Sequence, residues 1–351
     1  KTMNKIIGLL IGICILFIVL FYVVAKKNFN PKQQTSSALK GRLAFVSEID
    51  DNAEIYCINA DGSHLQRLTN HAADDFSPAW SPDGKQIAFS SVRDANYSKG
   101  ALRDKNCEIY VMNADGSCVR RLTHNETCDA TPVWSPDGKH IAFVSFRADR
   151  NTDICIINTI GNSQPRKLTD SAAWKYFPSW SADGSRIVFR SSGDGNRKGE
   201  FNYDIYVVEI DDLKMKRMTT DKGGDYEPKW SPDGTKIAFI AERDGRAGIY
   251  LLEPDGSNEK KLTESVFGDY SGMNIPYWSY FDWSIDGRSI VFTSDKDGNW
   301  QIYSVDVDGS GIKQLTHQRN GAGSPVWSPD GKLIAFKSLR NATAYDVYIM
   351  G

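Results

Sequence analysis

Three histidines are of a residue type, and at a spacing, that could bind a metal ion. His71, His124 and His317 each stand at or just after a Leu-Thr pair. A repeating fold would place them at equivalent points, where together they could hold a metal ion. Polar residues are also the ordinary content of loops, with no site implied. We therefore predict no metal and no other cofactor, and keep a metal on these three histidines as the alternative.

Acidic residues occur in neighbouring pairs that could serve as general acid and base. The pairs are Asp74 with Asp75, Asp211 with Asp212, and Asp225 with Glu227. Solvated loop charge accounts for such pairs without any catalysis. The sequence also contains no G-x-S-x-G motif, which carries the nucleophile of α/β-hydrolases. We therefore predict no catalytic residues and no enzymatic activity.

Aromatic residues gather in three connecting segments, most densely in the insertion 264–281. Grouped aromatic side chains with a few charges are typical of a binding patch. The alternative is that they pack beneath the long insertion as a small core of their own. The residues predicted to bind are Trp174, Tyr176, Tyr226, Phe267, Tyr270, Tyr277, Trp278 and Tyr280.

The elements that must position these residues come from a repeat. The stretch "AWSPDGKQIAF" at 79–89 returns five more times, and its tryptophans are spaced by 54, 46, 50, 53 and 44 residues. Periods of this length are typical of propellers, solenoids and arrays. The aligned tryptophans are Trp80, Trp134, Trp180, Trp230, Trp283 and Trp327.

Each repeat reads as four short strands, which we name a, b, c and d. Strand a ends at the Trp, a Pro-Asp-Gly turn follows, and strand b carries the Ile-x-Phe pattern. After a variable loop comes strand c, as in "EIYVMN" at 108–113, and strand d ends in Leu-Thr. The alternation and the tight turns predict a four-stranded antiparallel blade. Such units stacked radially make an all-β propeller.

Counting strands predicts the number of blades. Strands b and c occur seven times, whereas strands a and d occur six times each. Seven blades fit if residues 34–41 act as a degenerate first strand a and the last blade lacks strand d. A six-bladed ring is the alternative, but it leaves the last b and c strands without a sheet. The variable connections, d–a and b–c, share one face of such a ring.

The blade unit resembles the TolB-like β-propeller repeat family. The pattern "WSPDGxxIAF" followed by "IYxMNADGSxxRRLT" is met at 80–123, and the resemblance covers residues 41–350. The same blade type is found in the propeller domains of prolyl oligopeptidase-type and dipeptidyl-peptidase-type enzymes. The resemblance therefore implies the fold, and it implies little about function.

The first residues differ from the rest. Residues 6–25 form an unbroken apolar run of 20 residues, long enough to span a bilayer as a helix. We predict a signal-anchor at 1–25, a polar tether at 26–40 and the propeller at 41–351, with a cleaved signal peptide as the alternative. If the propeller is extracytoplasmic, one disulfide is possible among Cys107, Cys118 and Cys128.

Two functional hypotheses follow. The first is a non-enzymatic propeller, held by one N-terminal helix on the extracytoplasmic (periplasmic) side of the cytoplasmic membrane. It would dock another protein or a membrane complex as a scaffold or accessory subunit. The second is a carbohydrate-binding or carbohydrate-processing propeller with an axial site. A formal charge of −2 and the lack of a basic stripe argue against a nucleic-acid partner.

Overall fold

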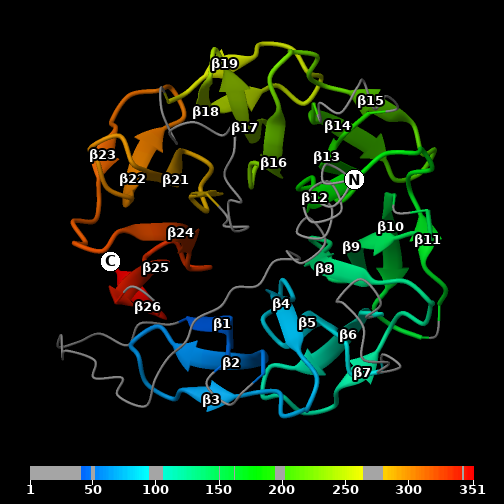
Figure 1. The fold of residues 1–351 in the computed structure, drawn as a ribbon. Coiled ribbons are helices and arrows are strands. Elements are labelled where there is room, and N and C mark those ends of the chain that lie inside the picture. Colours follow the sequence, from blue (N-terminus) through cyan, green and yellow to red (C-terminus); the bar gives the residue numbers. More distant parts are fainter. Residues whose placement is uncertain are drawn as a thin grey trace, which may run out of the picture.

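The computed structural model describes residues 41–48, 52–94, 106–149, 151–161, 163–193, 202–263, 280–341 and 344–351. Its strands form seven antiparallel sheets, five of four strands and two of three. Figure 1 shows the sheets arranged as blades around a ring. The prediction of an all-β propeller with seven blades is confirmed, and the six-bladed alternative is wrong because the last b and c strands form a sheet with their own strand a.

The strands of the first four blades are as follows. Blade 1 has β1 (Arg42–Ser47), β2 (Glu54–Asn59) and β3 (Gln66–Arg67); blade 2 has β4 (Asp75–Trp80), β5 (Gln86–Ser91), β6 (Glu108–Asn113) and β7 (Arg120–Arg121); blade 3 has β8 (Asp129–Trp134), β9 (His140–Phe146), β10 (Thr152–Asn158) and β11 (Arg166–Lys167); blade 4 has β12 (Lys175–Trp180), β13 (Arg186–Ser191), β14 (Asp204–Glu209) and β15 (Met215–Arg217).

The remaining three blades complete the ring. Blade 5 has β16 (Asp225–Trp230), β17 (Ile237–Arg243), β18 (Arg246–Leu252) and β19 (Lys260–Lys261); blade 6 has β20 (Phe281–Trp283), β21 (Ser289–Ser294), β22 (Gln301–Asp306) and β23 (Lys313–Gln314); blade 7 has β24 (Ala322–Trp327), β25 (Ile334–Asn341) and β26 (Ala344–Met350). Blade 7 ends at strand c, as predicted. The predicted first strand a at 34–41 lies, except for Gly41, outside the described residues.

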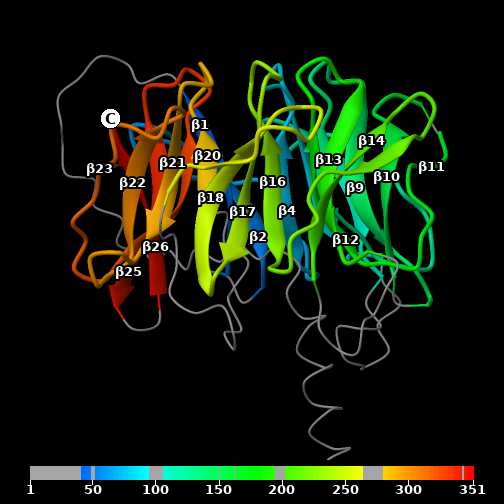
Figure 2. The same ribbon diagram turned by 90° about the horizontal axis from the view of Figure 1, so that it is seen from above.

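The strands run between two faces of the ring, which Figure 2 shows edge-on. Because each blade is an antiparallel meander, its a–b and c–d turns share one face, here called the turn face. The b–c and d–a connections share the other, called the loop face. The predicted membrane helix at 6–25 lies outside the described residues. Among those described, no helix has the length and apolar character needed to cross a bilayer.

The repeated motifs have structural roles. In each of three blades the Trp Nε1 donates a hydrogen bond to strand a of the preceding blade, for example from Trp134 to the Ala79 oxygen at 3.0 Å. In the Pro-Asp-Gly turn, Asp83 accepts from Ser81 Oγ at 2.7 Å and from the Lys85 amide at 3.1 Å. The six-fold repeat therefore joins blade to blade and closes turns.

The Leu-Thr pair holds the acidic residue at the start of strand c. Thr69 Oγ1 accepts from the Ile55 amide at 2.9 Å and donates to Glu54 Oε2 at 2.5 Å. Arg67 pairs with the same carboxylate at 2.7 Å. Blade 2 repeats the arrangement with Thr123, Arg121 and Glu108. These buried acids are satisfied by their own blade, so they stabilise the fold.

The inner strands share a bulge. The residue before Pro adopts a left-handed conformation in five of the blades, with φ between 50° and 57°, and the a–b register shifts there. The residues are Ser77, Thr131, Phe177, Glu227 and Ser324. A bulge turns an amide away from its ladder. The Thr131 amide then donates to Ser90 Oγ of the preceding blade at 3.2 Å, and that of Ser324 to Thr293 Oγ1 at 3.1 Å.

A disulfide joins two neighbouring blades. Cys107 lies just before β6 in blade 2 and Cys128 just before β8 in blade 3, and the two residues are bonded with their Cα atoms 4.2 Å apart. Cys118 is exposed and unbonded. Of the three candidate cysteines, Cys107 and Cys128 therefore form the disulfide.

Candidate functional site

The predicted aromatic residues Tyr176 and Tyr226 meet around an arginine between blades 4 and 5. The Arg190 guanidinium carbon lies 5.2 Å from the ring centre of Tyr176, 4.8 Å from Phe177, 4.4 Å from Tyr203 and 5.6 Å from Tyr226. All five side chains are half-buried. We call this group the Arg190 box. A cation over several ring faces is held in place by their quadrupoles.

Strand order explains why the box lies on the loop face. Tyr176 and Tyr226 stand second in inner strands β12 and β16, which begin at that face. Arg190 stands next to last in β13, which ends there, and Tyr203 immediately precedes β14. Along β13, Val188 packs with blade 5 whereas Ile187 and Phe189 pack with blade 3. Since side chains alternate along a strand, Arg190 faces blade 5.

Arg190 departs from the pattern of the other blades. The residue that follows the strand-b Phe is Val46, Ser90, Val144, Ile240 or Thr293 elsewhere, and Lys337 in blade 7. Where this residue is Ser90 or Thr293, its hydroxyl accepts an amide from the next blade. A guanidinium has no acceptor and cannot do this. Arg190 therefore gives up a structural hydrogen bond that two other blades keep.

The guanidinium of Arg190 has no counter-ion among the residues that the structure describes. No carboxylate pairs with it there, and its Nε is buried without a hydrogen-bond partner. The described residues offer no hydrogen-bond acceptor to the terminal nitrogens of this half-buried side chain either. An arginine whose two parallel terminal donors have no partner among the described residues is suited to bind an anion.

Tyr226 is fixed in the box by its surroundings. A Cβ on Gly224 would lie 2.1 Å from the Tyr226 hydroxyl oxygen, so the ring folds back over a chain segment that only glycine permits. The ring also packs against the core between blades 5 and 6. Burial raises the pKa of Tyr226 to about 12, although Arg190 acts in the opposite direction. The phenol is therefore neutral at physiological pH and serves as a wall of the box.

A second cation, Lys229, stands near the turn-face end of β16 and lines a cleft of about 360 Å³ to which blades 4, 5, 6 and 7 contribute. Trp230, Trp283 and Trp327 line this cleft together with Lys229 and Asp282. Lys229 and Asp282 occupy a position of strand a that holds an uncharged residue in blades 2, 3, 4 and 7. Among the six blades compared, only blades 5 and 6, which border the cleft, therefore have a charged residue at this position.

Lys229 differs from Arg190 in having carboxylates beside it. Its Nζ lies 3.4 Å from Glu227 Oε1 and 3.8 Å from Asp282 Oδ1, and it donates to the Phe281 oxygen at 2.5 Å. Glu227 also accepts the Tyr280 amide at 3.0 Å, and Asp282 accepts the Trp327 amide at 3.0 Å. Burial raises the pKa of Asp282, and Lys229 acts against this. This group joins three blades and supplies its own counter-charge.

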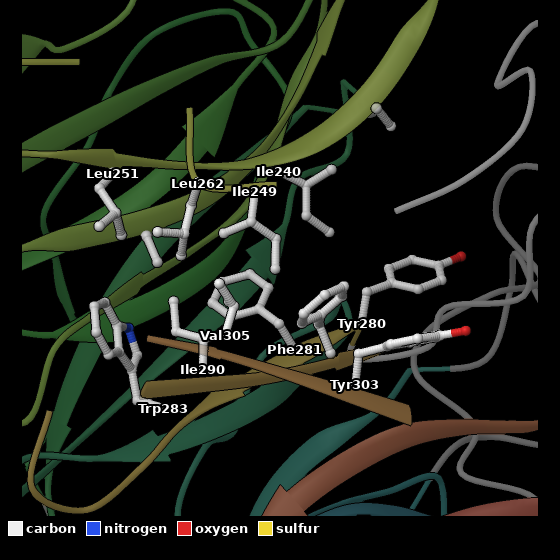
Figure 3. Close-up of a cluster of buried hydrophobic side chains, with 13 residues drawn as sticks. Ile240, Ile249, Leu251, Leu262, Tyr280, Phe281, Trp283, Ile290, Tyr303 and Val305 are labelled. Atoms are coloured by element: carbon white, nitrogen blue, oxygen red, sulfur yellow. The ribbon is translucent and has the colours of Figure 1, made fainter. Parts of the chain in front are cut away.

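The other predicted binding residues have different surroundings. Trp174 is half-buried, and its amide donates to Ser192 Oγ at 3.0 Å. Tyr280 is 8% exposed, and Figure 3 shows its ring beside those of Phe281 and Tyr303 in the core between blades 5 and 6. For Tyr280 the structure favours the packing alternative. Phe267, Tyr270, Tyr277 and Trp278 lie outside the described residues.

The three histidines stand apart in the structure as described. Each is exposed, and within the described ranges no three His, Cys, Asp or Glu side chains could hold a metal ion together. His71 takes part in the hydrogen bonding of its own loop, because its Nδ1 accepts the Ala73 amide at 3.1 Å and its amide donates to Glu54. The described residues therefore give no support to the metal alternative on His71, His124 and His317.

Sequence reasoning missed Arg190, Phe177, Tyr203, Lys229 and Asp282. The repeated stretch that predicts the blades ends at the strand-b Phe, one residue before Arg190. A comparison of that next position across the blades shows a cation at Arg190 and Lys337 and a small or apolar residue in the other five. Such a substitution in a repeat is a signal of function, because architecture does not require it.

The chain is similar to TolB proteins over part of its length. A family model described as the TolB beta propeller domain matches residues 195–281. A TolB homolog of Chlorobium chlorochromatii is 29% identical over 143 residues, which cover 32% of this chain and 32% of that protein. A Tol-Pal system protein TolB of Desulfosudis oleivorans is 29% identical over 124 residues, covering 26% and 28%. The matches thus span about a third of the length of these relatives.

Solved structures show the same fold. The putative TolB of Agrobacterium tumefaciens has a TM-score of 0.55 and 23% identity, covering 83% of this chain and 95% of that one. An oligogalacturonate lyase in complex with manganese has a TM-score of 0.67 and 14% identity, covering 88% and 85%. At these identities the likeness concerns the fold alone.

Proposed function

Since this chain is a β-propeller of the TolB-like family, we propose that it is a non-enzymatic binding subunit that docks another protein through its loop face. In this proposal residues 1–25 anchor it in the cytoplasmic membrane, residues 26–40 are a tether, and the propeller lies on the extracytoplasmic side. Its partner is a protein or a membrane protein complex, and no nucleic acid is involved. The Arg190 box is the centre of the docking surface.

The observation that carries the proposal is the difference between the two faces. The described turns repeat from blade to blade, and their polar groups are used within the fold. On the loop face, by contrast, Arg190 stands among four rings without a carboxylate from the described residues. Aromatic and arginine side chains are the residue types that contribute most to protein interfaces.

Two further features favour an extracytoplasmic position. The disulfide between Cys107 and Cys128 would persist in an oxidising compartment and be reduced in the cytosol. The apolar run 6–25 has the length of a membrane-spanning helix. Relatives named for the Tol-Pal system are consistent with a partner that is part of a membrane assembly.

Partner docking can be tested with the full chain expressed at native level in its source membrane. The chain would be cross-linked in whole cells, solubilised in detergent and purified through a C-terminal tag. We expect the wild-type chain to purify with a defined companion, and the Tyr176→Ala, Tyr226→Ala double variant to lose it. A wild-type chain that purifies as a monomer without companions would contradict the proposal.

A triple variant is the matched control. Replacing His71, His124 and His317 with Gln alters the same loop face but none of the residues of the Arg190 box. We expect this variant to keep the companion at the wild-type level. Loss of the companion in the histidine variant, with retention in the tyrosine variant, would place the docking surface elsewhere and refute the role of the box.

A further inference from the structure

We propose that the Arg190 box is a receptor for a single carboxylate of a partner peptide, with the two terminal nitrogens of Arg190 as the donors. The inference rests on the proposed docking role and adds to it the chemical group that is recognised. It starts from a half-buried cation that the described part of the chain leaves without a counter-charge. A partly desolvated charge is stabilised when an opposite charge binds it.

The charge of the box selects a singly charged ligand. Among the described residues Arg190 is the one cation over these rings, and Lys229 is paired with Glu227 and Asp282. A phosphate group carries nearly two charges and is usually bound by a cluster of arginines. A carboxylate carries one charge, and its two oxygens match the two parallel donors of a guanidinium.

The rings favour a peptide over a sugar. A glycan binds aromatic side chains by stacking on exposed ring faces, and here Tyr176, Phe177, Tyr203 and Tyr226 have a guanidinium over their rings. These faces are therefore occupied before any ligand arrives. The part of the guanidinium left for a ligand is the end that carries the two terminal nitrogens, because Nε is buried.

The box is ordered in advance, which lowers the entropic cost of binding. Four rings restrict the guanidinium plane, and Gly224 lets the Tyr226 ring fold back against its own strand. Phe177 has a left-handed backbone, with φ of 57°, which belongs to the bulge shared by the inner strands. An arginine held in this way loses less side-chain freedom on binding than an exposed one.

The experiment measures peptide binding to the purified full chain in detergent by fluorescence anisotropy, with a neutral dye on every probe. The probes are an end-blocked Ala-Glu-Ala peptide, its Ala-Gln-Ala counterpart, and trialanine with a free carboxyl terminus. Unlabelled inorganic phosphate and trigalacturonate serve as competitors. The Glu and free-carboxyl probes distinguish a side-chain source of the carboxylate from a chain terminus.

We expect at least one carboxylate probe to bind at least roughly tenfold more tightly than the Gln peptide, as expected for a charge-assisted hydrogen bond. Arg190→Gln should remove this preference. Arg186→Gln is the matched control, because Arg186 lies in the same strand, 4.7 Å from the Trp230 ring centre, and should leave binding unchanged.

Three outcomes would overturn the inference: no preference for a carboxylate, equal binding by Arg190→Gln, or preferential binding of phosphate or trigalacturonate. Thermal melting of each variant shows whether Arg190→Gln is folded. Arg190→Lys keeps the positive charge, so its peptide affinity tests the role of the guanidinium even if Arg190→Gln does not fold. The two proposals can fail separately. If Arg190→Gln retains its companion in cells, carboxylate recognition by Arg190 is refuted and the proposed docking surface is not. If the wild-type chain has no companion, the docking function itself is refuted.

Discussion

Arg190 and Lys229 are two cations in neighbouring blades, each beside aromatic rings, Arg190 near the loop-face end of β13 and Lys229 near the turn-face end of β16. Lys229 has two carboxylates within 4 Å and joins three blades. Arg190 touches four rings and has no carboxylate among the described residues. A charged residue at a repeat position can stabilise the fold or bind a ligand. A counter-ion supplied by the chain indicates the first role, and its absence among the described residues indicates the second.

The sharpest test of this comparison is stability after removal of each charge. Lys229→Met leaves Glu227 and Asp282 close together without their cation, so the free energy of unfolding should fall by about 4 kcal/mol. Arg190→Met leaves no carboxylate among the described residues without a cation, and it removes a buried Nε that has no hydrogen-bond partner. The free energy of unfolding should therefore fall by less than about 1 kcal/mol. Urea denaturation of both variants measures the difference. An equal loss of unfolding free energy in the two variants would contradict the distinction between a structural Lys229 and a ligand-binding Arg190.

Two buried aspartates at the start of inner strands repeat the comparison for negative charges, one with an ion pair and one with none among the described residues. Asp225 pairs with Arg243 at 2.7 Å, whereas Asp129 has no ion pair in the described ranges and accepts from Asn125 Nδ2 at 2.8 Å. Burial raises the pKa of Asp129 to about 7 and that of Asp225 to about 6.

Because the folded pKa of Asp129 exceeds its unfolded value, the folded state holds the proton more tightly. The stability from this group is fully present below about pH 4 and is lost as the pH rises to about 7. Asp129→Asn should therefore become more stable than wild type as the pH rises through this window, by roughly 4 kcal/mol at pH 8. Melting temperatures from pH 4 to pH 8 test this. Asp225→Asn is the comparison and should gain less at pH 8, because the pKa of Asp225 is raised only to about 6. Arg243 keeps its ion pairs with Asp221 and Glu259 in this variant.

The geometry of the box can be disturbed without touching its charge. Gly224→Ala would push the Tyr226 ring from its position, because the new methyl group would lie 2.1 Å from the hydroxyl oxygen. We expect a loss of roughly 1–2 kcal/mol in stability and weaker peptide binding. Gly245→Ala is the control for backbone effects, since a Cβ there meets nothing within 4 Å, although its φ of +71° adds strain. Unchanged peptide binding by Gly224→Ala would show that Tyr226 is not part of the receptor.

The smallest effect on stability is expected for Arg190→Lys. An ammonium keeps the charge over the rings, so the free energy of unfolding should change by less than about 0.5 kcal/mol. It lacks the planar fork, so binding of a carboxylate should weaken several-fold. Denaturation and anisotropy on the same preparation separate the two effects. A larger stability loss than in Arg190→Met would show that the guanidinium is required by the fold.

Much of the architecture could be predicted because a blade is a local object. The Pro-Asp-Gly turn, the Ile-x-Phe strand and the Leu-Thr pair each follow from a few consecutive residues, and their repetition gives the number of blades. The candidate site was predicted in part, since Tyr176 and Tyr226 belong to the Arg190 box. Tyr280 was placed on the surface as one of two alternatives, yet it is buried, because β20 brings it under the neighbouring blade.

The sequence by itself determined that this protein is a propeller of four-stranded blades, because hydrogen-bonded turns and alternating strands are encoded by neighbouring residues. It favoured seven blades over six, and the sheet formed by β24, β25 and β26 decided the number. The tertiary structure alone decided which side chains meet. Arg190 collects its rings from positions 176–177, 203 and 226, which lie in strand β12, the connection before β14 and strand β16. The reason is physical: alternation tells which side of a sheet a residue faces, but only the stacking of one blade on the next decides what it finds there.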